Sequence, residues 1–318
     1  MKIYLKLKKK MVFCFLLFVV GCGLFTWQGI YLAKDKNSQI KKSFLIEKGQ
    51  GIEEISFNLQ KENLIKNRWS FLVYVFFKGD SKRIKAGEYL LSSTQTIPEI
   101  VHKFVSGDII KEKITIIEGW NLRDIGWYFL NKGMFQVEEL YELKNWEGYL
   151  FPDTYEIKKG DTLEEIIKKM LDNFNKKLTA ELKEEIENQG KTISEIVIMA
   201  SLLEKEIKTT TDKEIVSGIL WKRLKNNIPL QVDATITYIT GKRTSKIPKE
   251  DLEIDSPYNT YKYKGLPFGP ICNPGMESIL AAIYPIETDF WYYLSAPEET
   301  IFSKTLEEHN LAKQEYLR

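Results

Sequence analysis

The spacing of hydrophobic and polar positions changes several times along this chain, and each change predicts a structural element. The first segment is apolar throughout, because residues 11–33 contain no charged side chain. These 23 residues are enough to cross a bilayer as a helix, and they exceed the apolar core of an ordinary signal peptide. We therefore predict a single membrane-spanning helix, with residues 1–33 forming a cytoplasmic tip and an anchor.

Four later stretches share one pattern, in which residues first alternate and then follow a helical spacing. A polar or glycine turn separates the two parts, and an acid precedes an isoleucine in each helix. Glycine permits the tight turn, and Thr or Asn after it can cap the helix. Each stretch therefore predicts a strand, a turn and an amphipathic helix. The four stretches are Phe44–Ile55, Tyr89–Ile100, Thr115–Ile125 and Tyr155–Ile166.

These units resemble LysM modules, which are small βααβ folds that bind N-acetylated glycans, and Gly160–Ile166 is the best match among them. A strand–turn–helix pattern that is common in αβ proteins, without shared ancestry, explains the repetition equally well, so both interpretations stay open. We expect an α+β protein with three parts. They are the anchor, a LysM-like α/β subdomain over residues 34–112 and a mixed α+β domain over residues 113–318.

A predicted helix from Thr192 to Lys208 is apolar over most of its circumference, yet it carries Glu204 and Glu206. Thr192 and Glu195 form a capping box at its start. A buried carboxylate costs several kcal/mol unless it is paired or protonated, and desolvation raises its pKa. A raised pKa is what a general acid needs near neutral pH. The spacing fits a catalytic acid, and it also fits a solvated pair at a fraying helix end.

The remaining patterns predict a scaffold helix and the elements of the C-terminal region. Residues 162–190 are rich in Lys and Glu and predict a long helix that is broken near Asn175. Further helices are expected at residues 212–226, 276–284 and from about Ser303, with a strand at residues 290–295.

Two segments between these elements are unusual for surface linkers. Trp146–Tyr155 contains four aromatic residues, which suit either stacking on sugar rings or a buried domain junction. Ser256–Gly275 is long, and its aromatic and proline residues favour a rigid binding wall over disorder. Polar side chains that can hydrogen-bond sugar groups lie between them. They are Gln231, Asp233, Thr235 and Tyr238. Asp233 fits either a second catalytic carboxylate or the cap of a short helix.

Charge and composition narrow the chemistry further. Five of the 46 basic residues precede the apolar segment, which leaves 41 against 44 acids and a balance of about −3. That balance makes no case for nucleic-acid binding, while the lysine cluster predicts a cytoplasmic N-terminus and an exported remainder. Cys272 is the only cysteine outside the apolar segment, and His102 and His309 are the only histidines. We therefore expect no disulfide, no metal site and no cofactor, with His309 structural.

A second interpretation of the N-terminus competes with the uncleaved anchor. Residues 19–22, Val-Val-Gly-Cys, fit a bacterial lipoprotein cleavage pattern in which Cys22 would be acylated. The apolar run continues past Cys22, whereas lipoproteins usually continue into a polar tether. This continuation favours the anchor.

Taken together, the motifs resemble the YceG-like family of endolytic murein transglycosylases. The matching segments run in the expected order over nearly the whole chain. They are the lysine-rich anchor, the LysM-like region, WEGYLFPDTY at 146–155, ASLLEKE at 200–206, LQVDATITY at 230–238, SPYNTY at 256–261, GLPFGPICNPG at 265–275 and Phe302–His309. The resemblance implies cleavage of nascent glycan strands between N-acetylmuramic acid and N-acetylglucosamine, leaving a 1,6-anhydro end. It makes residues 113–318 the catalytic domain and Glu206, the second glutamate of the pair, the catalytic acid.

The resemblance also directs attention to substrate contacts, with three departures from the usual pattern. Lys222 replaces an asparagine, Ala234 stands where proline is common, and Phe268 replaces a proline. These departures leave the acid untouched but put a substrate role for position 222 in doubt. The expected substrate contacts are Gln231, Asp233, Thr235, Tyr238, Tyr258, Asn259, Tyr261 and Asn273.

Three functional hypotheses follow, all of them at the cell membrane with the C-terminal bulk periplasmic or extracellular. In the first, Glu206 protonates the glycosidic oxygen and then accepts the proton of the muramoyl C6 hydroxyl, so no second carboxylate is needed. In the second, a muramidase-type hydrolase uses Asp233 to activate water. In the third, a non-enzymatic glycan-binding module organises wall-synthesis proteins, and residues such as Trp120 and Tyr89 carry the binding.

Overall fold

In the computed structural model, the chain divides into two compact units. The first comprises residues 1–112 and 156–161, and the second comprises residues 113–155 and 162–318. The structure describes residues 2–242, 247–296 and 299–316. The side chains of residues 2–10, 12, 14, 15, 18, 19, 22, 141 and 142 also lie outside this description, so the lysine cluster and the Cys22 thiol are not covered. Helices and two-stranded sheets make up the fold, which confirms the α+β class.

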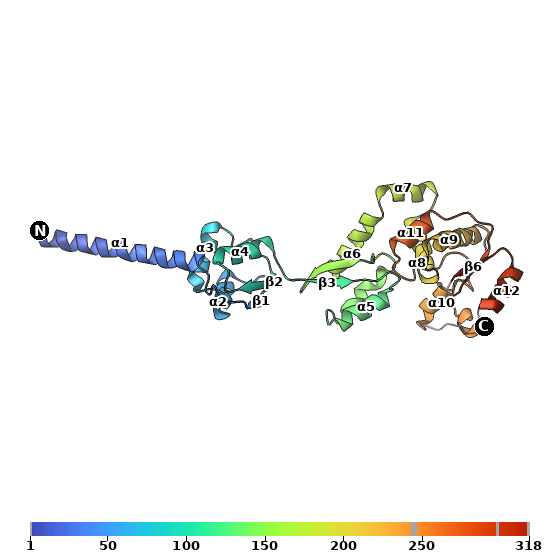
Figure 1. The fold of residues 1–318 in the computed structure, drawn as a ribbon, viewed down its shortest axis with the longest axis horizontal. Coiled ribbons are helices and arrows are strands. Elements are labelled where there is room, and N and C mark those ends of the chain that lie inside the picture. Colours follow the sequence, from blue (N-terminus) through green and yellow to red (C-terminus); the bar gives the residue numbers. More distant parts are fainter. Residues whose placement is uncertain (1, 243–246, 297–298, 317–318) are drawn as a thin grey trace. The chain divides into compact units, whose positions relative to one another are not determined.

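The first unit encloses one core between a strand pair and three helices (Figure 1). After α1, its elements are β1 (Lys41–Ile46), α2 (Ile52–Lys61), α3 (Arg68–Lys78), β2 (Gly87–Ser92) and α4 (Ile97–Ser106). β1 and β2 pair antiparallel, with Phe44 opposite Tyr89. Both rings are buried and pack against Phe104, whose centroid lies 4.7 Å from that of Tyr89.

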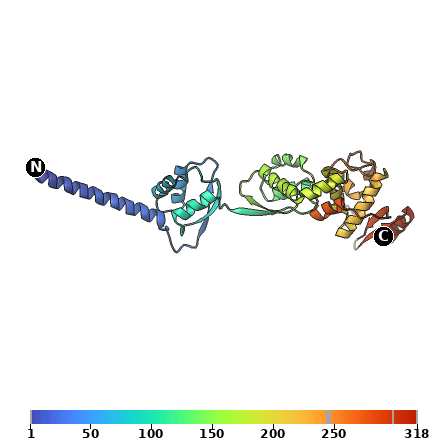
Figure 2. The same cartoon turned by 90° about the horizontal axis from the view of Figure 1, so that it is seen from above.

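α1 (Lys2–Tyr31) precedes this core as one long helix (Figures 1 and 2). Near its C-terminal end it packs on α3 and α4, and Ile30 is buried there. Gly29 makes this close approach possible, because a Cβ at that position would collide with the Ser70 side chain. Of the helices that the structure describes, none has both the length and the hydropathy of a membrane span. The membrane anchor therefore stays a prediction.

All four predicted strand–turn–helix stretches fold as expected. The third and fourth contribute β3 (Lys111–Thr115), α5 (Leu122–Asn131), β4 (Thr154–Lys158) and α6 (Leu163–Lys177), and β3 pairs with β4. The acid before isoleucine has a structural cause, since Glu99, Asp124 and Glu165 each complete a capping box at the third helical position. α2 is the exception, because its N-cap, Gly51, has no side chain to contribute.

The second unit is built around α8, which explains why that helix is apolar on nearly every side. Every residue from Ile196 to Leu203 is buried, and α7, α9, α10 and α11 pack against the helix (Figure 1). The remaining elements are η1 (Glu139–Asn145), α7 (Ala180–Asn188), α8 (Ile193–Glu206), α9 (Thr210–Lys225), α10 (Asp233–Thr240), η2 (Lys249–Glu253), α11 (Met276–Ile283), β5 (Tyr292–Ser295), β6 (Thr300–Ser303) and α12 (Leu306–Tyr316).

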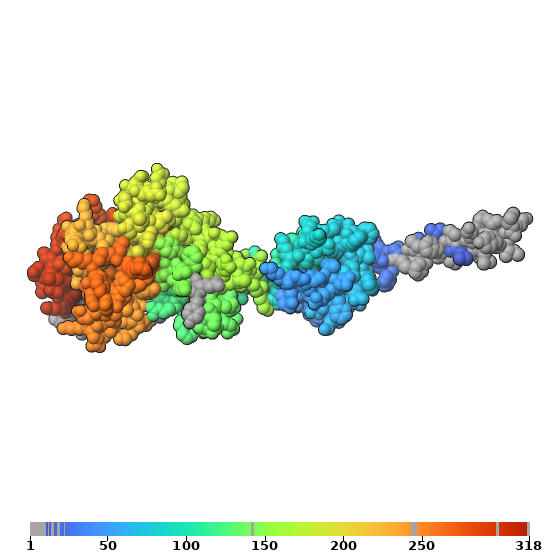
Figure 3. All heavy atoms as spheres, turned by 180° about the vertical axis from the view of Figure 1, so that it is seen from behind, coloured from blue at the N-terminus to red at the C-terminus, as the bar shows by residue number. Residues whose placement is uncertain are grey.

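Two details of this unit differ from the sequence prediction. The scaffold helix breaks after Lys177, slightly later than expected, because Thr179 caps a new helix by accepting a hydrogen bond from the Leu182 N–H. The terminal helix begins at Leu306, because residues 300–303 form the unpredicted strand β6 against β5. The long loop at residues 256–275 contains neither helix nor strand, as expected, and it contributes to the orange surface in Figure 3.

Candidate active site

Glu206 is the last residue of α8, and two separate segments of the second unit bind it, one at its side chain and one at its main chain. Its carboxylate Oε1 accepts a hydrogen bond from the backbone N–H of Ala234 at 2.8 Å. Ala234 lies in the first turn of α10, so the carboxylate sits at a helix N-terminus, where N–H groups favour negative charge. Ser295 of β5 holds the main chain, because its Oγ donates to the Glu206 carbonyl oxygen at 2.9 Å. The acid is therefore fixed in position and partly buried.

The carboxylate of Glu206 interacts electrostatically with Asp233, Tyr261 and Tyr293. Tyr261, from the long loop, donates its hydroxyl hydrogen to Asp233 beside the α10 N-terminus. Burial and then the charge of Glu206 raise the pKa of Tyr293 above its ordinary range. The Arg223 guanidinium instead donates hydrogen bonds to the backbone carbonyls of Trp291 and Leu230, at 2.8 and 2.9 Å. Within the described part of the chain, no cation is paired with Glu206.

These surroundings set the protonation of Glu206. Burial raises its pKa to about 7, the Ala234 N–H opposes that rise, and the neighbouring Asp233 charge adds to it. A carboxyl with a pKa near neutrality exists in both protonation states under physiological conditions. It can therefore donate a proton in one step and accept one in the next.

Glu204, two residues earlier on the same helix, has the opposite environment. Its Oε2 accepts hydrogen bonds from Ser278 Oγ at 2.5 Å and from the Gly275 N–H at 3.2 Å. The same oxygen pairs with Lys213 Nζ at 3.5 Å, and the two side chains are only 10% and 5% exposed. A buried, paired carboxylate of this kind holds helices together. The geometry thus separates two glutamates that periodicity alone left unresolved.

A second carboxyl with altered acidity, Glu147, was missed by the sequence analysis. It accepts hydrogen bonds from the Leu122 N–H at 3.2 Å and from the Tyr238 hydroxyl at 3.1 Å. Burial raises its pKa to about 7. Tyr238 belongs to α10, so Glu147 anchors the same helix whose first turn binds Glu206. The signal was present as an acid inside an aromatic run, but that run gave no indication of its partners.

A pocket of about 380 Å³ lies along α10, from Ala234 near the start of the helix to Gly241 at its end, and Glu206 itself is not among the lining residues. Its lining includes Lys205, which precedes Glu206, and Ala234, which binds it. Trp127 of α5 also lines the pocket and is 65% exposed, so its ring offers a flat apolar surface. Arg123 adds a positive charge at the same wall. An exposed aromatic ring beside polar groups is the usual composition of a sugar-binding surface, and sequence reasoning did not single out Trp127.

Three of the expected substrate contacts are buried and do not reach the surface of the protein. Thr235, Asn259 and Asn273 are each at most 1% exposed. The Asn259 amide donates to the carbonyls of residues 252 and 254 and accepts from two N–H groups of its own loop. Asn273 joins the loop to Trp120 and Leu150. These three side chains shape the site from inside, since internal hydrogen bonds use their polar atoms.

The other expected contacts lie closer to Glu206 or at the surface. Gln231 and Asp233 are exposed, and Gln231 adopts a left-handed φ of 53°, which is uncommon outside glycine. Asp233 is the first residue of α10, whose N-cap is Val232, so the short helix is confirmed but the expected cap is one residue late. Tyr238 and Tyr258 contact each other with their rings tilted by 46° and their centroids 5.0 Å apart.

The residues named for other roles are buried or packed against a neighbouring ring. Tyr89 is fully buried, which is incompatible with the glycan contact suggested for it in the non-enzymatic hypothesis. Trp120 packs on Tyr128 at 5.3 Å and is partly buried. His309 stacks on Tyr292, and burial lowers its pKa to about 4, in line with a structural role. Cys272 is a free, buried cysteine.

The chain is similar to known proteins over almost its whole length. Residues 44–315 match the YceG-like family. An endolytic murein transglycosylase of Bacillus subtilis (strain 168) is 33% identical over 330 residues, covering 94% of this chain and 91% of the relative. Another, from Streptococcus pneumoniae serotype 2 (strain D39), is 28% identical over 355 residues and 95% of this chain, which spans 64% of that relative.

A solved structure is similar as well. The crystal structure of a yceG-like protein from Listeria monocytogenes shares 33% sequence identity with this chain and gives a TM-score of 0.56. The match covers 86% of this chain and 99% of the Listeria chain. The likeness therefore extends beyond the neighbourhood of α8 to most of both molecules.

Proposed function

This chain belongs to the YceG-like family, and we propose that it acts as an endolytic murein transglycosylase, cleaving the glycan strands of peptidoglycan. Relatives that bear this name support the assignment, and so does the geometry of one side chain. Glu206 is fixed at both ends, partly buried and unpaired with any described cation, with a pKa of about 7. That combination suits a single group that must act as acid and then as base.

The first step breaks the glycosidic bond between N-acetylmuramic acid and N-acetylglucosamine. Protonated Glu206 donates its hydrogen to the bridging oxygen, which leaves with the bonding electrons as the hydroxyl of the departing sugar. The anomeric carbon becomes oxocarbenium-like, and the Glu206 carboxylate now carries a negative charge. Asp233 accepts a hydrogen bond from the Tyr261 hydroxyl near the same helix end. Its negative charge adds to that of Glu206 and stabilises the positive charge that develops at the anomeric carbon.

The second step closes a ring without water. The C6 hydroxyl of the muramoyl residue attacks the anomeric carbon, and the Glu206 carboxylate accepts its proton. A bond from C1 to O6 forms, the acid regains its hydrogen, and the product is a 1,6-anhydromuramoyl end. Because the nucleophile is already part of the substrate, a second carboxylate is unnecessary, and intramolecular reactions gain large effective concentrations.

A muramidase-type hydrolase is the rival reaction, and one observation favours it. Asp233 is an exposed carboxylate close enough to influence Glu206, so it offers a group that could activate water. The two reactions use the same acid, so only their products distinguish them. Hydrolysis adds one water to the new end, whereas ring closure does not.

We also propose where this reaction takes place. The uncharged run at residues 11–33 and the five preceding lysines support a single-pass anchor with a cytoplasmic N-terminus. The catalytic unit would then lie on the outer side of the cell membrane, periplasmic or extracellular, among the proteins that synthesise the wall. The order β1–α2–α3–β2, with β1 and β2 antiparallel, supports a LysM-like subdomain over residues 34–112.

The test is digestion of purified glycan strands by the full chain, followed by mass spectrometry of the new ends. We expect ends lighter by one water than those made by a muramidase on the same strands. Reducing ends of full mass would replace the lytic mechanism by hydrolysis. If the chain releases no fragments from strands that a muramidase does cut, the enzymatic assignment itself is wrong.

A further inference from the structure

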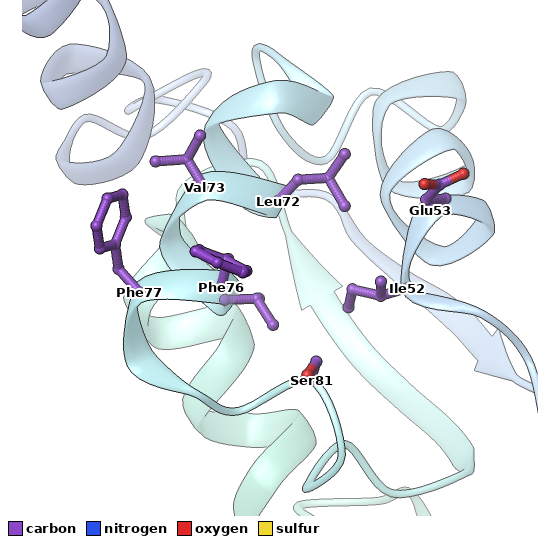
Figure 4. Close-up of a pocket in the computed structure, with 8 residues that line it drawn as sticks. Ile52, Glu53, Leu72, Val73, Phe76, Phe77 and Ser81 are labelled. Carbon is purple, nitrogen blue, oxygen red and sulfur yellow. The ribbon is translucent and has the colours of Figure 1, made fainter.

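The outward side of α3 carries large apolar side chains that the fold leaves in contact with solvent. Trp69, Val73, Phe76 and Phe77 are 61%, 37%, 79% and 83% exposed. Their spacings of four, seven and eight residues place them on one side of the helix. Figure 4 shows Val73, Phe76 and Phe77 projecting from α3. We refer to these four residues as the outer face of α3.

The inner side of α3 is already sufficient to hold the helix in place. Phe71 and Val75 are buried in the core of the first unit, and Ser70 is buried against α1. A helix with one buried face normally presents polar residues on the opposite side. A second apolar face therefore indicates an additional partner, since exposed apolar patches of this kind mark interaction surfaces.

The outer face of α3 is continuous with the surface of α1. A groove of about 460 Å³ is lined by Phe25 of α1 together with Trp69 and Val73 of α3. On the α1 side, Phe25, Trp27 and Tyr31 are 63%, 54% and 49% exposed. On the other side, Ile52 and Phe76 help to line a pocket of about 410 Å³, whose rim also carries the acidic Glu53 (Figure 4). One apolar surface thus runs from the last turns of α1 across α3.

Basic side chains flank this surface at both ends of α3. Only Asp80 is acidic between residues 63 and 87, and it is paired with Arg83 at 2.8 Å. Aromatic and aliphatic residues bordered by Lys and Arg are the composition of helices that lie in the headgroup region of a membrane. The flanking basic residues are Lys66, Arg68, Lys78, Lys82, Arg83 and Lys85.

We propose that the outer face of α3 rests in the surface of an anionic phospholipid bilayer, next to the point where α1 leaves the membrane. The proposal rests on the proposed membrane anchor and adds a second contact to it. The apolar side chains enter the boundary between headgroups and acyl chains, and the flanking cations meet lipid phosphates. Two contacts from one unit fix its tilt relative to the bilayer, which an anchor alone would not do.

The test uses the position of tryptophans in the chain. Trp27 and Trp69 are the two tryptophans of the first unit, so a Trp27→Phe background leaves Trp69 as its one reporter there. The full chain is reconstituted in phosphatidylglycerol–phosphatidylcholine vesicles with or without brominated acyl chains, which quench tryptophan on contact. The signal of Trp69 is the difference from a matched Trp27→Phe/Trp69→Phe chain. We expect brominated lipid to remove roughly half of that signal or more.

Matched substitutions test the surface. Phe76→Asp/Phe77→Asp should abolish the quenching, whereas Leu45→Asp, which changes a 54% exposed position of β1 in the same unit, should leave it unchanged. Lys78→Glu/Lys82→Glu should weaken it in anionic vesicles and have little effect in pure phosphatidylcholine.

Flotation of the chain with the vesicles separates the outcomes. A chain that floats while Trp69 is not quenched keeps its anchor and overturns the α3 contact. A chain that fails to float overturns the anchor and this proposal together. Shielding of Trp69 that appears only in a dimer, and is lost with Phe76→Asp/Phe77→Asp, would assign the face to a second copy and also overturn the lipid assignment.

Discussion

The surroundings of Glu204 and Glu206 differ in kind, although the two residues lie on the last turn of one helix. Glu204 faces a lysine, a serine hydroxyl and a backbone N–H, all buried with it. Glu206 accepts a hydrogen bond from the Ala234 N–H and interacts electrostatically with Asp233, Tyr261 and Tyr293. The first environment surrounds the Glu204 carboxylate with buried hydrogen-bond and ion-pair partners, while burial raises the pKa of Glu206 to about 7. Helix position therefore says little about the surroundings of a carboxyl, which depend on what the neighbouring segments contribute.

Glu204 contributes to the stability of the fold, whereas Glu206 has the properties needed for activity. An ion pair in the interior holds α8 against α9, and its loss would leave an unpaired charge. A carboxyl that burial keeps partly protonated is costly to ionise inside the fold, and natural active sites often retain such groups at a cost in stability. The two glutamates thus predict opposite phenotypes for the same chemical change.

The largest effect is expected on the rate of strand cleavage. Glu206→Gln removes the proton donor and acceptor while preserving size, so release of anhydro-ended fragments should fall by about 10³-fold or more, roughly 4 kcal/mol. Glu204→Gln, assayed at a temperature where it is folded, should retain cleavage within about tenfold of the wild-type rate. Equal losses in both variants would remove the distinction drawn between the two sites.

The next effect is on stability and falls on the other residue. Glu204→Gln leaves Lys213 buried without its carboxylate, so we expect a loss of about 3 kcal/mol in the free energy of unfolding. Urea denaturation monitored by circular dichroism measures it, with Glu206→Gln as the matched control. Adding Lys213→Met to Glu204→Gln should recover much of the loss, because the unpaired charge is gone. No recovery would mean that the serine and glycine hydrogen bonds, rather than the ion pair, dominate.

How much of this contrast was predictable is clear from particular residues. The Thr192 capping box and the apolar circumference of α8 follow from local spacing, because caps and burial patterns depend on neighbours in sequence. The partners of the two glutamates lie between 9 and 74 residues away, at Lys213, Ala234 and Ser278. No periodicity encodes such distances. Choosing Glu206 over Glu204 from the sequence therefore required the family resemblance.

For the loops, composition predicted an ordered segment but not the roles of individual side chains. The aromatic and proline content correctly indicated an ordered segment at residues 256–275, but it could not tell which polar atoms face the cleft. Asn259 and Asn273 have side chains that could bind sugars, yet their amide groups donate hydrogen bonds to backbone carbonyls inside the protein. A buried polar side chain is nearly always hydrogen-bonded inside the protein, most often to the backbone. Composition identifies candidate residues, whereas this requirement decides their role.

A smaller effect concerns the pH dependence of stability. The pKa of Glu206 rises on folding from 4.5 to about 7, so the folded state binds this proton more tightly than the unfolded state. The resulting stabilisation is complete below about pH 4.5 and is lost as pH rises through about 7. We expect about 2 kcal/mol from this one group, discounting for its partial exposure.

Denaturation at pH 5 and pH 8 measures this contribution. The fall in stability between the two pH values should be smaller in Glu206→Gln by about the stated amount, since glutamine does not titrate. Glu307→Gln, which changes an exposed residue of α12, should behave like the wild type. An unchanged fall in Glu206→Gln would indicate that the carboxyl is not desolvated in the folded chain.

The smallest effect isolates the one donor that opposes burial at Glu206. Ala234 occupies the second position of α10, and Pro98 occupies the equivalent position of α4, so a helix start in this chain accommodates proline there. Ala234→Pro removes the N–H that stabilises the carboxylate, which should raise the pKa of Glu206 further. Because the protonated acid begins the reaction, the alkaline fall of kcat/KM should move upward by roughly half to one pH unit. Ala234→Gly retains the N–H and should leave the profile in place. If the two variants shift alike, the change comes from the backbone of α10 rather than from the lost donor, and the N–H does not control the acid.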